Sequence, residues 1–360
     1  SEVVLAAFSE WGEGCVDHLR GMFALICWDR LNLELHVIRD RIGIKPLYIY
    51  QKGETYHFAS EIKAIINFCP EAAQQNEDSI FKFLARGWLD DSPATFYEKI
   101  RSIEPGTSLC INSEGVKKRR YWRLPEGENY TFDQDEFLTS FDETVGIHLQ
   151  SDVSLAATLS GGLDSSSIVA MAARAKKGIE SIQAFSVIPP RTVDESSWID
   201  STIKTTGIKH QYLNPNWQQM PDLFDEVIGF HDEPFQSSSC IYQFLLRREV
   251  ADQGIKVLLV GEGGDEVLGG YRRLLLPYLY ALELDGQQEL FENAIKGGSS
   301  FLGISSEAIV LKLAKYRNLI KNGGNGQENK SAYGLLEKDF INRNHECTEA
   351  RAYPAIEPGN

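Results

Sequence analysis

The feature that most constrains the fold of this chain is an alternation of short apolar runs with helical patterns between residues 136 and 261. The apolar runs are SLAATL, SIQAFSVI, HQYL and IKVLLVG, and the stretches around them have the apolar spacing of amphipathic helices. This alternation predicts a doubly wound parallel sheet, covered by helices on both faces. Right-handed crossovers then place the carboxyl ends of the strands along one edge, where ligands bind.

The first 120 or so residues follow a different pattern. The runs FALICWD, LELHVIRD, PLYIYQKG and TYHFAS alternate or are apolar throughout, and polar turn residues bound each of them. IEPGTSLCIN and GVKKRRYWRL indicate a further hairpin. Helical spacing occurs at residues 3–9, 16–23 and 61–68. The region is therefore predicted to be a layered antiparallel β structure with a few helices.

A polar stretch over residues 125–135 has the composition of a linker. We therefore expect one domain over residues 1–124 and a second over residues 136–360. Within the second domain, the chain beyond Tyr271 has helical patterns and then becomes polar, and NGGNGQENK is expected to be a mobile loop.

The composition excludes several classes of protein. Hydrophobic residues make up 42% and charged residues 24% of the chain, as in soluble globular proteins. The formal net charge of −15 would repel a duplex nucleic acid, so the basic run KKRRYWR is interpreted as a solvated hairpin face. The start, SEVVLAAFSEW, lacks the basic region of a signal peptide, and nothing downstream resembles a membrane span. Neither nucleic acid nor membrane is an expected partner.

The cysteines indicate a reducing environment. They are Cys15, Cys27, Cys69, Cys110, Cys240 and Cys347. None is paired in a C-x-x-C motif, and no histidine cluster has metal-ligand spacing along the chain. The pattern favours reduced, mostly buried thiols in a cytoplasmic protein over a zinc site or a disulfide framework.

The segment TLSGGLDSSS, residues 158–167, has the composition of a phosphate-binding loop between a strand and a helix. Its glycines allow a close approach to an anion, and the following helix offers N–H groups at its positive end. The predicted donors are Ser160, Gly161, Gly162, Ser165 and Ser166. Asp164 distinguishes the loop from a Walker motif, because an acid beside phosphate makes sense only if Mg²⁺ bridges the two. The segment therefore predicts a site for a polyphosphate and Mg²⁺.

A second acidic, glycine-rich loop follows the strand IKVLLVG. The sequence VLLVGEGGDEVLGGYRR, residues 257–273, carries Glu262, Asp265 and Glu266 at the end of that strand. Carboxylates at such a strand end can bind a metal or position a nucleophilic amine. The length of the motif makes an ordinary solvated turn a poor explanation.

These motifs resemble those of known enzymes. The S-G-G-x-D-S loop resembles the pyrophosphate-binding loop of the N-type ATP pyrophosphatases, which fixes a reaction type and not a substrate. G-E-G-G-D-E-V-L-G-G-Y is similar to the signature of the asparagine synthetase family. RGMFALICWD, RDRIGIKPLYIY and FASEIKAI resemble the later part of that family's class II glutamine amidotransferase domain. The resemblance covers residues 1 to about 273.

The resemblance implies a fold and a set of roles. The fold is a partial N-terminal-nucleophile αββα sandwich followed by an ATP pyrophosphatase domain. Asp164 and Asp265 would hold Mg²⁺, and Glu262 would act on the acyl-adenylate and on ammonia. Further contacts to the nucleotide are implied for four residues: Leu159, Val187, Val260 and Gly261.

The implied reaction is the ATP-dependent amidation of the aspartate side chain by ammonia, normally from glutamine, to give asparagine, AMP and pyrophosphate. The small molecules aspartate and ammonia or glutamine are thus the implied partners, with a homodimer as an assembly to consider. Two alternatives stay open. One is a related synthetase that acts on another carboxylate, as in β-lactam closure or peptide cyclisation. The other is a nucleotide-binding remnant without turnover.

The resemblance also has gaps. The family's N-terminal nucleophilic cysteine and a later lysine segment find no match, so the chain is expected to be a piece cut at both ends and unable to hydrolyse glutamine. Cys15 is internal and lacks the α-amino group that would serve as base, so it is assigned no catalytic role. Asp232 and Glu233 lie where the family lines its acceptor site, and the sequence favours that role and solvated loop acids equally.

Overall fold

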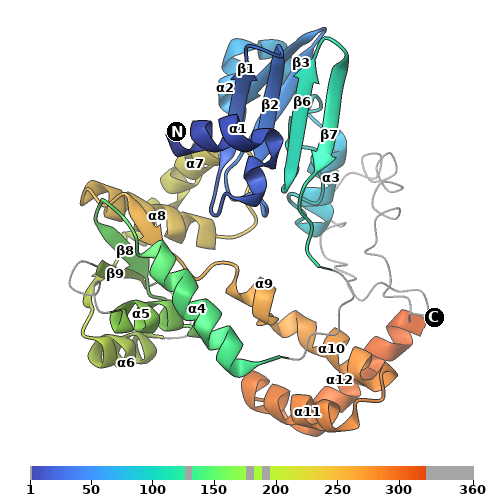
Figure 1. Cartoon of the computed structure of the whole chain (residues 1–360). Coiled ribbons are helices and arrows are strands. Elements are labelled where there is room, and N and C mark those ends of the chain that lie inside the picture. Colours follow the sequence, from blue (N-terminus) through green and yellow to red (C-terminus); the bar gives the residue numbers. More distant parts are fainter. Residues whose placement is uncertain (1, 126–131, 176–181, 189–194, 322–360) are drawn as a thin grey trace. The chain divides into compact units, whose positions relative to one another are not determined.

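The computed structural model describes residues 2–125, 132–175, 182–188 and 195–321, which form two compact units (Figure 1). The first unit contains the described chain up to residue 125 together with Ile228–Phe235. The second contains the remaining described residues. The expected linker, 125–135, overlaps residues outside the described ranges, and the expected mobile loop NGGNGQENK lies wholly outside them.

The first unit is built on two antiparallel sheets. One sheet has the strand order β1-β2-β6-β7 and the other β4-β3-β5. Their strands are β1 (Ala24–Asp29), β2 (Glu34–Arg39), β3 (Tyr48–Lys52), β4 (Thr55–Ala59), β5 (Ile100–Ser102), β6 (Thr107–Asn112) and β7 (Gly115–Arg120). Each predicted β run of this region contains a strand, so the antiparallel prediction is confirmed.

Alternation along the strands gives this unit four layers. Val37 and Leu109 of the first sheet pack against Ile49 and Phe58 of the second, so one core lies between the sheets. Helix α1 (Glu2–Trp11) and the 3₁₀ helix η1 (Gly12–Asp17) cover the outer face of the first sheet, to which Ile38 belongs. The outer face of the second sheet packs on α2 (Ile62–Phe68) and η2 (Pro70–Ala73). The layer order is that of the αββα sandwich predicted by resemblance.

Two details of this unit differ from the expectation. Residues 16–23 have helical apolar spacing, but the structure contains only the 3₁₀ turn η1, which ends at Asp17. Val16 is fully buried on the outer face of the sheet, so the spacing reflects packing rather than a helix. Helix α3 (Glu77–Arg86) was not predicted, although Asn76 caps its first turn by accepting from Ser79 N–H and the left-handed Gly87 ends it.

The second unit contains the predicted parallel sheet. Its strands are β8 (Leu155–Thr158), β9 (Ile182–Val187), β10 (Lys209–Leu213) and β11 (Val257–Leu259), in the order β10-β9-β8-β11. All neighbouring pairs are parallel. The helices that accompany them are α4 (Gln134–His148), α5 (Leu163–Arg174), α6 (Ser196–Thr206), α7 (Met220–His231) and α8 (Ser239–Asp252).

Helices cover both faces of this sheet. Ala157 and Ala184 face a core that also contains Val145 of α4, Val169 of α5 and Ile199 of α6. Ala156 and Phe185, which are neighbours of these residues on the strands, face the opposite core with Leu246 and Val250 of α8. The sheet is therefore doubly wound, as the sequence predicts.

The rest of the second unit is helical. Its elements are η4 (Trp217–Gln219), α9 (Gly264–Leu268), η5 (Arg272–Leu274), α10 (Leu275–Leu284), α11 (Gln288–Leu302) and α12 (Ser306–Lys321). Leu279, Ile295 and Ile309 pack the last three helices together. Among the described residues no helix is both long and apolar enough to cross a membrane.

Candidate active site

The strand order of the parallel sheet indicates a ligand site at the carboxyl ends of β8 and β11. From β8 the chain moves outward to β9 and then to β10, whereas β11 returns to the other side of β8. This reversal is a topological switch point, where loops diverge at the carboxyl ends of the strands and leave space for a ligand. The register pairs Leu259 of β11 with Ala157 of β8, so both strands end at the same edge. The two sequence motifs are therefore the two loops of the switch point.

Hydroxyl groups hold the first loop in shape. The Ser165 Oγ accepts a hydrogen bond from the Ser160 N–H at 3.1 Å and lies 3.0 Å from the Ser160 Oγ. Gly162 N–H in turn donates to the Ser160 Oγ at 3.3 Å. Ser165 is buried, whereas Ser160 and Gly162 are exposed. Ser165 therefore organises the predicted cradle from below, and the exposed residues are the ones available to an anion.

The backbone of the loop requires glycine at one position. Gly161 has φ +82°, a conformation that residues with a side chain rarely adopt. A Cβ at this residue would lie 3.0 Å from the carbonyl oxygen of Glu195, just before α6. Gly162, at φ −69°, is the residue before α5, whose first turn supplies N–H groups without partners inside the helix. The loop and the helix start together form a surface suited to a polyphosphate.

The second loop contacts the acid of the first. A Cβ built on Gly264 would lie 2.6 Å from the carboxyl carbon of Asp164, and one on Gly261 would lie 3.2 Å from the Asp164 Cβ. The two glycines therefore let the second loop approach Asp164 more closely than any residue with a side chain would. Asp265 follows Gly264 directly in the first turn of α9. The fold thus places Asp164 beside Gly264, the residue before Asp265, whose own carboxylate lies next to Gly270, and a hard, oxygen-binding cation is the kind of ion such carboxylates take.

Glu262 lies in the same loop and has a charged neighbour. Its carboxylate is 3.4 Å from the Arg247 guanidinium of α8, and both side chains are about half exposed. An exposed pair of this kind contributes little to stability, so both groups are free to exchange partners. Arg247 was not identified from the sequence. The pair Arg247-Arg248 on a predicted amphipathic helix directly before the motif strand was the feature that could have indicated it.

The predicted adenine and ribose contacts lie at the ends of β8 and β9. The Leu159 side chain is buried in the core, its N–H donates to the Phe185 carbonyl at 2.9 Å, and its carbonyl accepts from the Ser186 hydroxyl. Val187 is half-buried at the carboxyl end of β9. Val260, directly before Gly261, is half-buried as well. Their contacts with a nucleotide stay predictions.

A half-buried histidine supports this strand end. His210 Nε2 lies 2.7 Å from the Ser186 Oγ. Since the single Ser186 hydroxyl proton goes to the Leu159 carbonyl, His210 Nε2–H is the donor of that second bond. Burial lowers the pKa of His210, against the opposing effect of Asp200. The neutral ring therefore connects β10 to the residue that begins the phosphate loop.

Asp232 and Glu233 are structural residues of the first unit. The Asp232 carboxylate pairs with Lys63 Nζ at 3.2 Å and accepts the Lys63 N–H, and its side chain is only 7% exposed. Glu233 accepts the Phe96 N–H at 2.7 Å, and burial raises its pKa. The interpretation as solvated loop acids is therefore wrong. Both side chains are committed to partners within the unit that contains residues 228–235.

The five cysteines within the described ranges are free thiols, as the sequence predicts. Cys15 and Cys69 are buried, whereas the other three described cysteines are partly exposed. Cys347 lies outside the described residues. The expectation of mostly buried thiols therefore holds for two of the described five.

Comparisons with known proteins match both units. A family model described as asparagine synthase matches residues 136–338, more than half of the chain. A model described as a glutamine amidotransferase domain matches residues 1–122.

Among curated relatives, the glutamine-hydrolyzing asparagine synthetase 3 of Bacillus subtilis (strain 168) is 30% identical over 290 residues, which cover 75% of this chain and 47% of the relative. The putative asparagine synthetase 2 of Methanocaldococcus jannaschii is 29% identical, over 77% of this chain and 55% of the relative. Amidase chry2 of Gibberella zeae is 30% identical, over 75% of this chain and 43% of the relative. The chain thus spans about half the length of the curated relatives it matches.

Similarity to solved structures is weaker. The NH3-dependent NAD synthetase from Campylobacter jejuni has 13% identity and a TM-score of 0.28, over 64% of this chain and 99% of that one. A glutamine-dependent NAD+ synthetase from Acinetobacter baumannii has 11% identity and a TM-score of 0.31, over 100% of this chain and 86% of that one.

Proposed function

We infer the function of this chain from one premise, which is that it belongs to the asparagine synthase family. We propose that its parallel-sheet unit is an ATP-dependent amide ligase. In this proposal ATP is cleaved between its α and β phosphates, a carboxylate becomes an acyl-adenylate, and ammonia converts it to an amide. The proposed carboxylate is the side chain of aspartate, and the product is then asparagine.

The observation that carries the proposal is the contact between Asp164 and the second loop at Gly261 and Gly264. A phosphate loop needs a cation beside its acid, and two loops that bring Asp164 beside Gly264, the residue before Asp265, fit that need. Mg²⁺ bound there would neutralise charge on the phosphates of ATP. The exposed residues of the first loop would hold the pyrophosphate while Asp164 and Asp265 held the cation.

The chemical steps then require little besides positioning. An oxygen of the substrate carboxylate attacks the α-phosphorus, and the bond to the bridging oxygen breaks as pyrophosphate leaves. Ammonia next attacks the acyl carbon, and AMP leaves with the bonding electron pair. The ammonia must lose a proton, and Glu262 is the carboxylate we propose to accept it. Arg247, which contacts Glu262, is suited to hold the negative charge of the substrate.

The source of ammonia follows from the match of the first unit. That unit corresponds to a glutamine amidotransferase domain, so in the whole protein we propose that ammonia comes from glutamine. The αββα unit of this chain supplies the scaffold for that reaction. A homodimer and a cytoplasmic location complete the proposal.

The proposal is tested by Mg²⁺-dependent nucleotide affinity in the Asp164→Asn variant. We expect the affinity for Mg-ATP to fall at least tenfold, which corresponds to about 1.4 kcal/mol. Asp152→Asn is the matched control, because it removes the same charge from an exposed residue just before β8. Equal affinities of the two variants, measured by calorimetry with and without Mg²⁺, would remove Asp164 from the cation site.

One relative supports a second candidate function, in which the substrate is a carboxylate other than aspartate. Amidase chry2 is as similar to this chain as the first synthetase named above, at 30% identity. Exchange of labelled pyrophosphate into ATP distinguishes the candidates, because it requires the carboxylate that the enzyme adenylates. We expect aspartate to support exchange. If only a different carboxylate supports exchange, the proposed adenylation stands and aspartate is not the substrate.

A further inference from the structure

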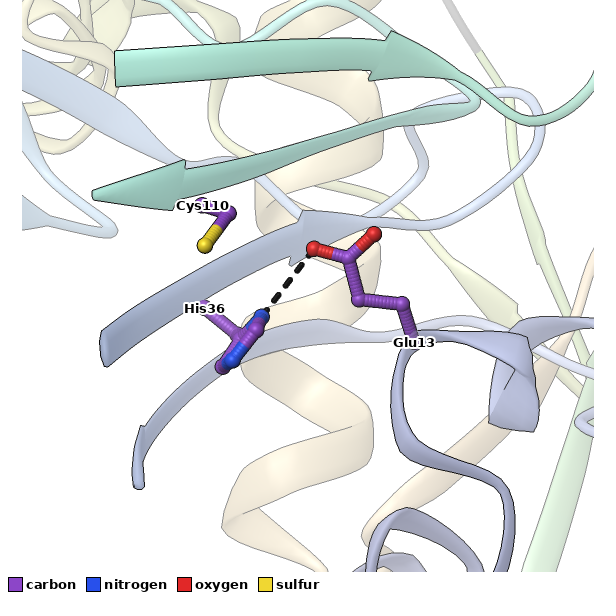
Figure 2. A group of neighbouring side chains, drawn as sticks. All are labelled: Glu13, His36 and Cys110. Atoms are coloured by element: carbon purple, nitrogen blue, oxygen red, sulfur yellow. Dashed lines mark hydrogen bonds and ion pairs between the residues drawn. The ribbon is translucent and has the colours of Figure 1, made fainter. Parts of the chain in front are cut away.

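Three side chains of types that bind metal ions in other proteins meet on the outer face of the first antiparallel sheet, in the first unit. The register places His36 of β2 opposite Cys110 of β6. Residues directly opposite each other in an antiparallel pair point to the same face. Glu13, from η1 above that face, reaches the same place. Figure 2 shows the three side chains converging, with the carboxylate of Glu13 directed at the His36 ring.

The distances between the three possible ligand atoms fit a small divalent cation. The Glu13 Oε1 is 3.1 Å from the His36 Nδ1, and a nitrogen of His36, a carboxylate oxygen of Glu13 and the Cys110 Sγ lie within 4.8 Å of one another. Around a tetrahedral zinc ion, bonds of about 2.0–2.3 Å place neighbouring ligand atoms roughly 3.3–3.7 Å apart. The nitrogen and oxygen therefore need to separate only slightly, and the sulfur needs a small side-chain rotation. One carboxylate, one imidazole and one thiol form a donor set that suits zinc.

The other ring nitrogen faces a carboxylate. His36 Nε2 lies 3.5 Å from the Glu34 Oε2, and the Glu34 Oε1 accepts a hydrogen bond from the Asn112 Nδ2 at 3.1 Å. Metal-binding histidines usually donate their second N–H to a carboxylate, which fixes the ring and strengthens the ligand. Glu34 lies close enough to take up this relation when His36 binds an ion, and the Nδ1 of the ring already faces Glu13.

Burial distinguishes the group from an ordinary surface cluster. His36 is 6% exposed, and Glu13 and Cys110 are partly buried. Burial raises the pKa of the Cys110 thiol, and the charges of Glu34 and Glu13 and a hydrogen bond to Glu34 add to the effect, so a metal ion would have to displace the thiol proton.

We propose that Glu13 Oε1, His36 Nδ1 and Cys110 Sγ form a zinc site, with a coordination position left for water. The bound ion would fasten η1 to strands β2 and β6. This site is separate from the proposed ligase chemistry, so it stands or falls independently of that function.

Cobalt substitution tests the site directly on the whole chain. Metal-free protein is titrated with Co²⁺ and the absorption is followed, because a cobalt–thiolate bond gives a charge-transfer band and a tetrahedral ion gives strong visible bands. We expect one equivalent of Co²⁺ to produce both and Zn²⁺ to abolish them by displacement. Cys110→Ser is expected to remove the charge-transfer band, whereas Cys240→Ser, which alters a free, partly exposed thiol of the second unit, is expected to keep it.

Two further variants keep the test decisive if Cys110→Ser folds poorly. Glu13→Gln is expected to weaken Co²⁺ affinity at least tenfold. Glu34→Gln leaves all three ligands in place and is expected to weaken affinity about 10- to 100-fold while the thiolate band persists. Absence of the band in the unaltered chain would overturn the proposal. So would a band that survives in Cys110→Ser, or Co²⁺ affinities unchanged in both glutamine variants.

Discussion

Asp164 and Gly264 are in contact, such that a single added carbon on Gly264 would lie 2.6 Å from the carboxyl carbon of Asp164. Asp164 follows β8 and Gly264 follows β11, two strands that are far apart in the sequence and adjacent in the sheet. The contact therefore joins the two motifs into one site. It also means that the position of the Asp164 carboxylate depends on the absence of a side chain across from it.

Gly264→Ala should separate function from stability. The residue begins α9 with an ordinary helical backbone, so alanine adds helix propensity worth up to about 1 kcal/mol. Its methyl group would displace the Asp164 carboxylate, and we expect Mg-ATP affinity to fall at least tenfold while the free energy of unfolding changes by less than about 1 kcal/mol. Gly146→Ala, in α4 with no atom near the added carbon, should leave affinity unaltered. Unchanged affinity in Gly264→Ala would contradict the placement of the cation.

The phosphate loop offers a matched pair of glycines. Gly161→Ala forces a side chain into φ +82° and toward the Glu195 carbonyl, and we expect it to lower the free energy of unfolding by about 1–3 kcal/mol. Gly162→Ala adopts an allowed φ and meets only the Ser160 Oγ, at 3.3 Å, so its effect should be clearly smaller. Urea unfolding of both variants checks the order. Equal losses of unfolding free energy in the two variants would show that the left-handed backbone at Gly161 does not require glycine.

Glu262→Gln should affect product formation more than binding. The variant keeps the size of the side chain and removes the charge that we assign to proton acceptance. We expect nucleotide affinity within about twofold of the unaltered protein and amide formation reduced by about 10²-fold or more. Arg247→Gln should instead raise the KM for the carboxylate substrate. Parallel losses of nucleotide affinity and of turnover in Glu262→Gln would identify Glu262 as a nucleotide contact.

His210 should make stability depend on pH. Burial lowers the pKa of His210 in the folded protein, so the unfolded chain takes up a proton first as the pH falls through about 6.5. Stability is therefore lost as the pH falls from that value toward the lower folded pKa. His210→Gln keeps a donor for Ser186 and should flatten the dependence of the unfolding free energy between pH 7.5 and 5.5. The slope of the unaltered protein should be steeper, and identical slopes would contradict the prediction.

The parts of this fold that the sequence revealed are those encoded locally. The strand before Ser160 and the strand before Glu262 are continuous apolar runs. The loops after them are rich in glycine and acidic residues, a composition that is uncommon outside ligand sites. Their adjacency follows from topology, because parallel strands end at one edge. The contact of Gly264 with Asp164 could not be predicted from the sequence, because it depends on the conformations of both loops.

Interactions between distant segments could not be predicted. Asp232 and Glu233 are polar residues in a loop by sequence, and only the fold shows Lys63 and Phe96 N–H as their partners. For the same reason, spacing along the chain gave no sign of the group formed by Glu13, His36 and Cys110. Strand register brings His36 and Cys110 together and η1 adds Glu13, so spacing along the chain carries no information about this group.

We propose above that this chain belongs to an enzyme that cleaves ATP between its α and β phosphates to activate a carboxylate. The most direct measurement is the identity of the nucleotide product when the protein is incubated with Mg-ATP, aspartate and ammonium, with the Asp164→Asn variant in parallel. We predict AMP and pyrophosphate in equal amounts with the amide, dependent on aspartate and absent in the variant. Formation of ADP and phosphate, or nucleotide left intact, would show that the protein does not adenylate aspartate.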